Sequence, residues 1–251
     1  MNILVLLRIV LDPAGFTVNR KAQKVFVNRE RFIVNPTDRN ALEAALALAG
    51  AEDTVTVAAL GGQAAREALQ MARAMGAHRA VCLEVPAALD ALAATRVLQA
   101  FVGHLGGVDL VLFGAEVLDS DMAQVAPRLA AALDCPFADG AWQVSARPDG
   151  LGLVMAQAGG YRWLGADLPA VATVTGDCNQ PRFAPAIAIM QVFTDPNAVE
   201  TLTIADLELD PASLLPMTVQ RGESFPPERT LGRLAEGDDA LRQIADALSG
   251  R

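Results

Sequence analysis

The stretch that decides the fold runs from residue 110 to residue 127: Leu110-Val111-Leu112-Phe113-Gly114-Ala115-Glu116-Val117-Leu118-Asp119-Ser120-Asp121-Met122-Ala123-Gln124-Val125-Ala126-Pro127. It opens with four apolar residues in succession, which is typical of a strand buried on both faces of a parallel sheet. A small and polar loop follows. A helical pattern then begins with Pro127 in its first turn, where a missing backbone N–H costs nothing. The stretch predicts one strand–loop–helix unit of an α/β protein.

The same unit recurs along the first two thirds of the chain. Apolar runs that predict further buried strands lie at residues 3–7, 55–60 and 80–83. Apolar residues at three- and four-residue spacing predict helices at residues 38–49, 64–75, 89–105 and 124–133. Strands that alternate with helices require right-handed crossovers. The predicted fold class is therefore α/β, with a doubly wound, mostly parallel, Rossmann-like sheet.

The pattern changes after residue 141. Residues 142–146 and 151–156 flank a turn at 148–150 and predict a β-hairpin, and Gly159-Gly160 predicts a turn into a third strand that runs through Trp163. Trp142, Tyr161 and Trp163 lie in these strands, which favours packing or subunit contact over ligand stacking. A further apolar run follows at residues 170–174.

The last sixty residues form an acidic segment. Beyond Gln191 there are eleven Asp or Glu residues against five Arg and no Lys. Apolar positions such as Leu202, Leu207, Leu214 and Leu215 make this segment too apolar for a free tail, so we expect it to lie across a partner. The predicted organisation is a nucleotide-binding α/β domain at residues 1–191, which includes the hairpin and a recognition loop, and a partner-wrapping arm at residues 192–251.

Composition excludes several classes of function. The net charge of −9 argues against nucleic acid as a partner, because binding to phosphates needs clustered Lys and Arg. Three separated cysteines and two histidines offer neither a metal cage nor a His-based triad. No apolar stretch reaches the roughly 18 residues of a membrane helix, and residues 1–10 resemble a strand more than a signal peptide. We expect a cytoplasmic protein without membrane insertion.

Loops at strand ends are the candidate ligand sites, because open α/β sheets bind ligands at the carboxyl ends of their strands. After the 110–113 strand, the backbone N–H groups of Gln124, Val125 and Ala126 would favour a phosphate. An ordinary strand-to-helix loop is an equally good interpretation, since there is no Walker lysine and no GxGxxG motif. Asp119 and Asp121 lie in this loop, but alternate loop residues need not converge on a metal or a proton.

Two further loops precede helical patterns. In Asn35-Pro36-Thr37-Asp38, Asn35 is a candidate for contact with a base or ribose, whereas helix capping by itself explains Asp38 and is the favoured interpretation. In Leu60-Gly61-Gly62, the glycines permit either close backbone approach or a tight turn. Neither loop contains a residue to which we assign catalysis.

Ordered sequence blocks resemble the electron-transfer flavoprotein beta subunit family over nearly the whole chain. The blocks lie at residues 3–12, 35–45, 72–79, 109–114, 119–127, 168–171, 179–183, 189–190 and 226–232. The resemblance implies an adenine-nucleotide-binding fold and a heterodimer with an alpha subunit that holds most of a shared FAD. It also implies AMP in the beta-subunit pocket, where a second FAD replaces AMP in some electron-bifurcating branches.

The resemblance also implies site residues. Those of the nucleotide pocket are Leu6, Asn35, Pro36, Thr37, Asp38, Leu60, Gly114, Asp119, Asp121, Ala123, Gln124, Val125 and Ala126. A partner-docking segment is implied at residues 174–196, and its docking residues are Arg182, Ala186, Ile189 and Met190. The implied activity is electron carriage from a flavin-dependent dehydrogenase toward a quinone-reducing acceptor, with no catalytic residue in this chain.

Two departures from the family pattern bear on these roles. Ala115 replaces the usual basic residue and Glu116 lies beside it, so an extended dinucleotide is less favoured in the pocket. Ala186 stands where the family places a leucine, and loss of that anchor corresponds to about 2–3 kcal/mol of contact. We therefore expect a dehydrogenase unlike the acyl-CoA type.

Two alternatives to this carrier function stay open. The first is a bifurcating carrier with a second FAD in the beta pocket. The second is a stand-alone nucleotide-binding regulatory α/β protein without redox work.

Overall fold

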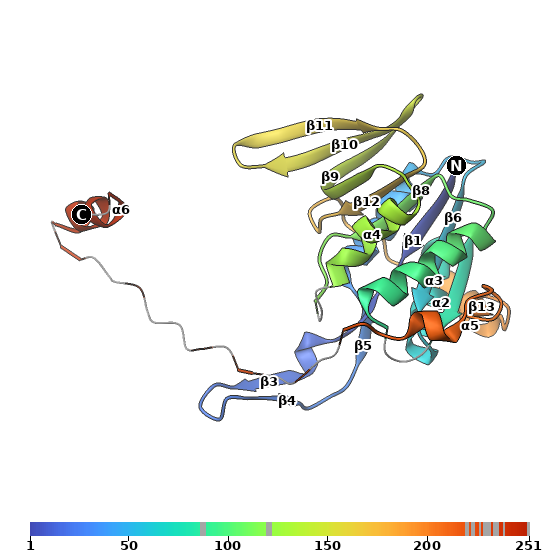
Figure 1. Ribbon diagram of the computed structural model, residues 1–251, viewed down its shortest axis with the longest axis horizontal. Coiled ribbons are helices and arrows are strands. Elements are labelled where there is room, and N and C mark those ends of the chain that lie inside the picture. The colour runs from blue at the N-terminus through green and yellow to red at the C-terminus, as the bar shows by residue number, and fades with distance from the viewer. Residues whose placement is uncertain are drawn as a thin grey trace. The chain divides into compact units, whose positions relative to one another are not determined.

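The computed structural model describes residues 1–85, 89–118 and 122–218, together with residues 221, 224, 225, 227, 232, 236, 237 and 239–249. The chain divides into two compact units, one of residues 1–17 and 25–219 and one of residues 18–24 and 220–251. The larger unit is built on a nine-stranded sheet (Figure 1).

The strands follow one another across the sheet in an order that differs from their order in the sequence. From one edge to the other they are β11 (Gly160–Ala166), β10 (Gly150–Gln157), β9 (Phe137–Arg147), β12 (Ala170–Val174), β8 (Leu110–Gly114), β1 (Asn2–Leu6), β6 (Thr54–Leu60), β7 (Arg79–Glu84) and β13 (Glu200–Thr203). All neighbouring pairs from β9 to β13 are parallel, whereas β10 is antiparallel to both β9 and β11. The predicted doubly wound, mostly parallel sheet is confirmed.

The strand order reverses beside β1. From β1 the chain continues to β6 and β7 on one side, and then crosses through α3 (Ala91–His104) to β8 on the other side. This reversal is a topological switch point, where the loops at the carboxyl ends of two adjacent strands separate and leave room for a ligand. The fold thus places its candidate site at the ends of β1 and β8.

Helices cover both faces of the sheet, and the run that opens at residue 110 shows why. Leu110 and Leu112 face the core cluster that contains residues of α1 (Pro36–Leu48) and α2 (Gln63–Met75). Val111 and Phe113 alternate to the opposite face and pack with α3 and α4 (Val125–Ala132), which Figure 1 shows on the near side of the sheet. A strand with helices on both faces needs a continuous apolar run, as predicted.

The predicted hairpin and third strand form an antiparallel extension of the sheet. Leu153 of β10 pairs with Val144 of β9 and with Leu164 of β11. Gly150 opens β10 with φ +143°, and a Cβ there would lie 2.3 Å from the carbonyl oxygen of Ala166, so this turn requires glycine.

The predicted arm begins within the larger unit. Residues 200–203 form β13 at the edge of the main sheet, where Leu202 pairs with Leu83 of β7. Leu202, Leu207 and Leu214 are buried in the core cluster that also contains α3. The chain therefore buries these three leucines itself, and contact of the arm with a partner stays a prediction. Leu215 is exposed.

Four short strands were not predicted from the sequence. β2 (Ile9–Leu11) pairs with β5 (Phe32–Val34), and β3 (Phe16–Asn19) pairs with β4 (Lys24–Val27). Three or four residues give no readable periodicity, so these pairs depend on contacts rather than on pattern. α5 (Ala186–Thr194) was also missed.

In the smaller unit, α6 (Ala240–Leu248) exposes Leu241, Ile244 and Leu248 along its length. Among the helices of the described residues, none is both long and apolar enough to cross a bilayer.

Candidate functional site

Three neighbouring strands end at the switch point and carry predicted site residues. Register pairs Val5 of β1 with Leu112 of β8 and Leu6 of β1 with Ala58 of β6. Leu6, Leu60 and Gly114 therefore lie at the same edge of the sheet on adjacent strands. The structure brings these three predicted residues together.

The first turn of α1 lies directly on the end of β8. A Cβ built on Gly114 would lie 2.2 Å from Oγ1 of Thr37, 2.5 Å from its carbonyl carbon and 2.6 Å from the backbone nitrogen of Asp38. Contact this close is possible only at glycine. The absence of a side chain on Gly114 thus allows the start of α1 to pack directly on the end of β8. The residues placed there are Asn35, Pro36, Thr37 and Asp38.

A buried ion pair joins the same elements. The carboxylate of Asp38 is fully buried and accepts hydrogen bonds from the backbone nitrogen of Arg8 at 2.8 Å, from its Nε at 2.9 Å and from the backbone nitrogen of Gly114 at 2.8 Å. Arg8 Nη2 also donates to the carbonyl oxygen of Gly114 at 2.6 Å. Burial raises the pKa of Asp38, and the hydrogen bonds from Arg8 and Gly114 oppose that shift.

The favoured interpretation of Asp38 as a helix cap is wrong. α1 begins at Pro36, its N-cap residue is Asn35, and no side chain caps it. Asp38 lies inside the first turn and binds β1 and β8 instead. Arg8, which sequence reasoning did not select, is the centre of this arrangement. Its signals were that a lone cation follows an apolar strand and that it lies in the first family block, residues 3–12.

The side chain of Asn35 holds the loop after β8. Its Nδ2 donates to the carbonyl oxygen of Glu116 at 2.7 Å, its Oδ1 accepts from the backbone nitrogen of Leu118 at 3.3 Å, and Oγ1 of Thr37 donates to the same carbonyl oxygen of Glu116 at 2.8 Å. The β2–β5 strand pair places Asn35 beside this loop. The pairing continues one residue beyond Ile9 and Val34, where the backbone nitrogen of Asn35 donates to the carbonyl oxygen of Arg8. Both polar atoms of the Asn35 amide are thereby used within the chain.

Helix starts at this edge differ in how they are capped. Gly62 precedes α2 and Gln124 precedes α4, and neither helix has a side-chain cap. By contrast, Asp90 caps α3 by accepting from the backbone nitrogen of Ala93 at 2.9 Å. A Cβ on Gly62 would meet nothing within 4 Å. The first-turn N–H groups of α2 can therefore receive an anion, whereas a 3-10 turn at Met122–Gln124 leads directly into α4.

The remaining predicted pocket residues follow β8. Ala123 and Gln124 are exposed in the 3-10 turn η2 (Met122–Gln124), and Val125 and Ala126 are buried at the start of α4. Asp119 and Asp121 lie outside the described residues. In the described part of the chain, no cluster of His, Cys, Asp and Glu can hold a metal.

The predicted docking segment carries a row of exposed apolar side chains. Phe183 is 90% exposed, and Ile187 and Met190 of α5 are 72% and 70% exposed at helical spacing. We name Phe183, Ile187 and Met190 the docking stripe. Of the residues predicted for docking, Ala186 and Met190 are exposed, Ile189 is half-buried, and Arg182 forms an ion pair with Glu43. Ile187 was missed because only the helix shows that it lies one turn before Met190, and Phe183 was missed because it precedes the helix in an irregular segment.

Comparison with known proteins identifies the family. The family model described as electron transfer flavoprotein domain matches residues 23–209. The chain is 33% identical over 219 residues to the electron transfer flavoprotein subunit beta of Clostridium acetobutylicum, which covers 85% of this chain and 83% of the relative. The chain belongs to the electron-transfer flavoprotein beta subunit family.

Other members of the family come from distant organisms. The human electron transfer flavoprotein subunit beta is 32% identical over 248 residues, covering 96% of this chain and 95% of the relative. Subunit CarD of the caffeyl-CoA reductase-Etf complex of Acetobacterium woodii is 29% identical over 255 residues, covering 99% and 96%. Membership of this flavoprotein family implies electron transfer and an alpha-subunit partner.

Proposed function

We propose that this chain is the beta subunit of a heterodimeric electron-transfer flavoprotein of the cytoplasm, which carries electrons from a flavin-dependent dehydrogenase toward a quinone-reducing acceptor. The proposal includes a FAD held mainly by the alpha subunit and a structural AMP in the cleft of this chain. FAD, when bound, supplies the one- and two-electron chemistry. The observation that carries the proposal is the Arg8–Asp38–Gly114 arrangement, which fixes three chain segments around the switch point.

The residues of the cleft fit a mononucleotide. The backbone N–H groups of Gln124, Val125 and Ala126 are proposed to bind one phosphate, and the half-buried Leu60 is proposed to provide apolar surface for a base. Leu6 is only 4% exposed and offers a base almost no surface. Asn35, Thr37 and Asp38 are proposed to act through the loop that they hold rather than through direct contact. Their role in nucleotide binding stays a proposal, as does that of Asp119 and Asp121.

A second FAD in the cleft is the competing proposal, and the match to subunit CarD favours it. The two linked phosphates of a dinucleotide extend over a longer stretch than the single phosphate of AMP, so they need positive charge on the loop after β8 as well as at the helix start. Ala115 and Glu116 provide none in the loop after β8, and the guanidinium of Arg8 is already paired with Asp38. These charges favour AMP.

The nucleotide content tests the proposal. We expect the heterodimer, purified after co-expression with its alpha subunit, to release one FAD and one AMP per pair on denaturation, as counted by mass spectrometry. Two FAD and no AMP would establish the bifurcating type. A colourless monomer that binds ATP without an alpha subunit would contradict the carrier function altogether.

A charge variant locates the phosphate. Gln124→Glu is expected to weaken AMP binding about tenfold, because it adds a negative charge at the start of α4. Gln157→Glu makes the same change at an exposed position of β10 and is expected to leave AMP binding unchanged. Isothermal titration of the nucleotide-stripped heterodimer with AMP measures both. If the two variants bound AMP with equal affinity, the phosphate would not lie at the start of α4.

The docking stripe is proposed to bind the dehydrogenase. Its three exposed side chains compensate for the absence of the family leucine at Ala186. We expect Ile187→Asp to raise the KM of the dehydrogenase for the carrier by about 10- to 30-fold with little change in kcat, as loss of an interface hot spot of about 2 kcal/mol requires. Met217→Asp, at a 75% exposed position elsewhere, serves as the matched control. If KM rose equally in Ile187→Asp and Met217→Asp, the dehydrogenase would not dock specifically on the stripe.

A further inference from the structure

The loop that leads into α5 is fastened to α1 by a reciprocal amide pair. Nδ2 of Asn40 donates to the carbonyl oxygens of Asn179 at 2.8 Å and Gly176 at 3.1 Å. Nδ2 of Asn179 donates back to the carbonyl oxygen of Asn40 at 2.9 Å. Asn40 is only 6% exposed, so water does not compete effectively for these bonds.

A charged pair follows one helical turn later. Arg182 donates to Glu43 through its backbone nitrogen at 3.0 Å, through Nε at 2.8 Å and through Nη2 at 2.9 Å, using both carboxylate oxygens. Burial alone would raise the pKa of Glu43, but the bonds from Arg182 outweigh it and lower the pKa. This forked geometry fixes direction as well as distance. Because the backbone nitrogen of Arg182 is included, the pair also orients the residue that follows, Phe183.

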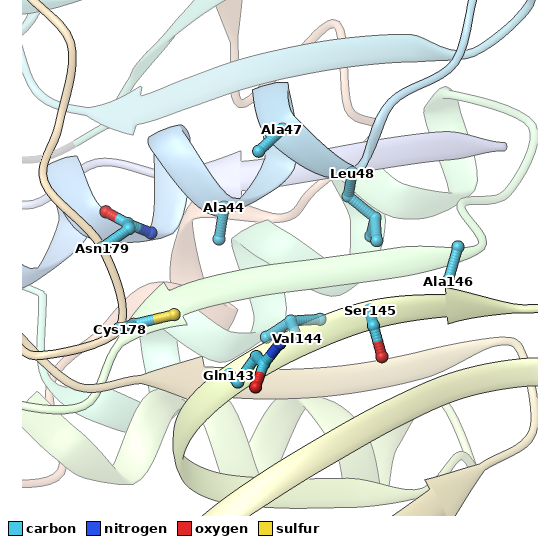
Figure 2. A pocket seen from close by; sticks show the side chains of 9 residues that line it. All are labelled: Ala44, Ala47, Leu48, Gln143, Val144, Ser145, Ala146, Cys178 and Asn179. Atoms are coloured by element: carbon cyan, nitrogen blue, oxygen red, sulfur yellow. The ribbon is translucent and has the colours of Figure 1, made fainter.

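Packing by itself does not hold this loop. A cavity of about 370 Å³ lies between α1 and β9, and Figure 2 shows Cys178 and Asn179 at one end of it. Its walls include Ala44, Leu48 and Val144. Cys178 packs against the core, but the loop otherwise borders this open pocket on that side, so its position depends also on the polar contacts with α1.

We infer that Asn40 and Glu43 are positioning residues for partner docking, which fix the 176–182 loop on α1 and so set the direction in which the docking stripe faces its partner. The inference rests on the proposed docking function of that stripe. It assigns a role to two residues of α1 that belong neither to the proposed nucleotide site nor to the docking stripe. It also gives α1 two tasks, since its first turn holds the loop after β8 and its next turn holds the docking segment.

A double-mutant cycle on the heterodimer tests the inference. The variants are Glu43→Gln, Arg182→Gln and the two together, with Glu52→Gln at an exposed loop position as the matched control. We expect either single change to speed hydrogen exchange in residues 183–194 about tenfold and to raise the KM of the dehydrogenase for the carrier about tenfold, with kcat and the AMP and FAD content unchanged. The double variant should cost no more than either single one.

The outcomes separate this inference from the proposed function. The dehydrogenase used is one that reduces the wild-type heterodimer. If none does so, the proposed carrier function fails, and the positioning role falls with it. If the wild type is reduced normally but Glu43→Gln leaves both exchange and KM unchanged, the inference alone is overturned. Additive losses in the double variant would also overturn it, because they would show that Glu43 and Arg182 do not act as a pair.

Discussion

Replacing Arg8 by methionine is expected to lower the free energy of unfolding by about 3–5 kcal/mol at pH 8, because it leaves a buried carboxylate without its counter-ion. Asp38 would keep only two backbone donors, those of residue 8 and Gly114. The loss should also release the loop after β8, since Arg8 donates to the carbonyl oxygens of Gly114 and Glu116. Chemical denaturation at fixed protein concentration measures the change in the free energy of unfolding.

The same variant is expected to depend on pH in a defined direction. Without Arg8, burial raises the pKa of Asp38 further above its ordinary value of 3.8. The folded variant then holds a proton at a pH where the unfolded chain has lost it. Stability therefore falls as pH rises through the folded-state pKa, and the loss relative to wild type is smaller at pH 5 than at pH 8.

A control separates charge from shape. Arg8→Met combined with Asp38→Asn removes both charges and keeps an amide oxygen that can accept from Gly114. We expect this double variant to lose less stability than Arg8→Met alone and to show no comparable pH dependence. An equal loss at pH 5 and pH 8 in the single variant would contradict a buried, ionised Asp38.

The second large effect is expected from Gly114→Ala. The added Cβ would lie 2.5 and 2.6 Å from backbone atoms of Thr37 and Asp38, and the backbone of a helix cannot rotate away as a side chain can. We expect a loss at the upper end of the range for overpacking, about 3 kcal/mol, together with weaker AMP binding. Denaturation and AMP titration measure the two consequences.

The matched control for this glycine lies in α3. A Cβ on Gly103 would meet nothing within 4 Å, so Gly103→Ala is expected to be neutral or to stabilise by up to about 1 kcal/mol through helix propensity. If Gly114→Ala were as stable as Gly103→Ala, the first turn of α1 would not lie on the end of β8, and the close packing described there would be wrong.

The sequence by itself determined the architecture and the family. Four-residue apolar runs such as 110–113 encode strands with helices on both faces, because every residue of such a strand must be buried. Helical spacing encodes the helices that cover them, and the order of family blocks identified the chain. These signals are local, so they can be read without knowing what lies across the fold. They also located the strand-end loops that are proposed to hold the nucleotide.

Only the tertiary structure decided what individual polar residues do. Asp38 was predicted to cap its own helix, but it pairs with Arg8, thirty residues away, and with the end of β8, seventy-six residues away. Glu43 binds Arg182 across 139 residues. Leu202, Leu207 and Leu214 of the arm are buried in the core cluster that contains α3. A buried polar group takes whichever donor or acceptor the packed chain brings to it, and that choice depends on long-range contacts that no local pattern records.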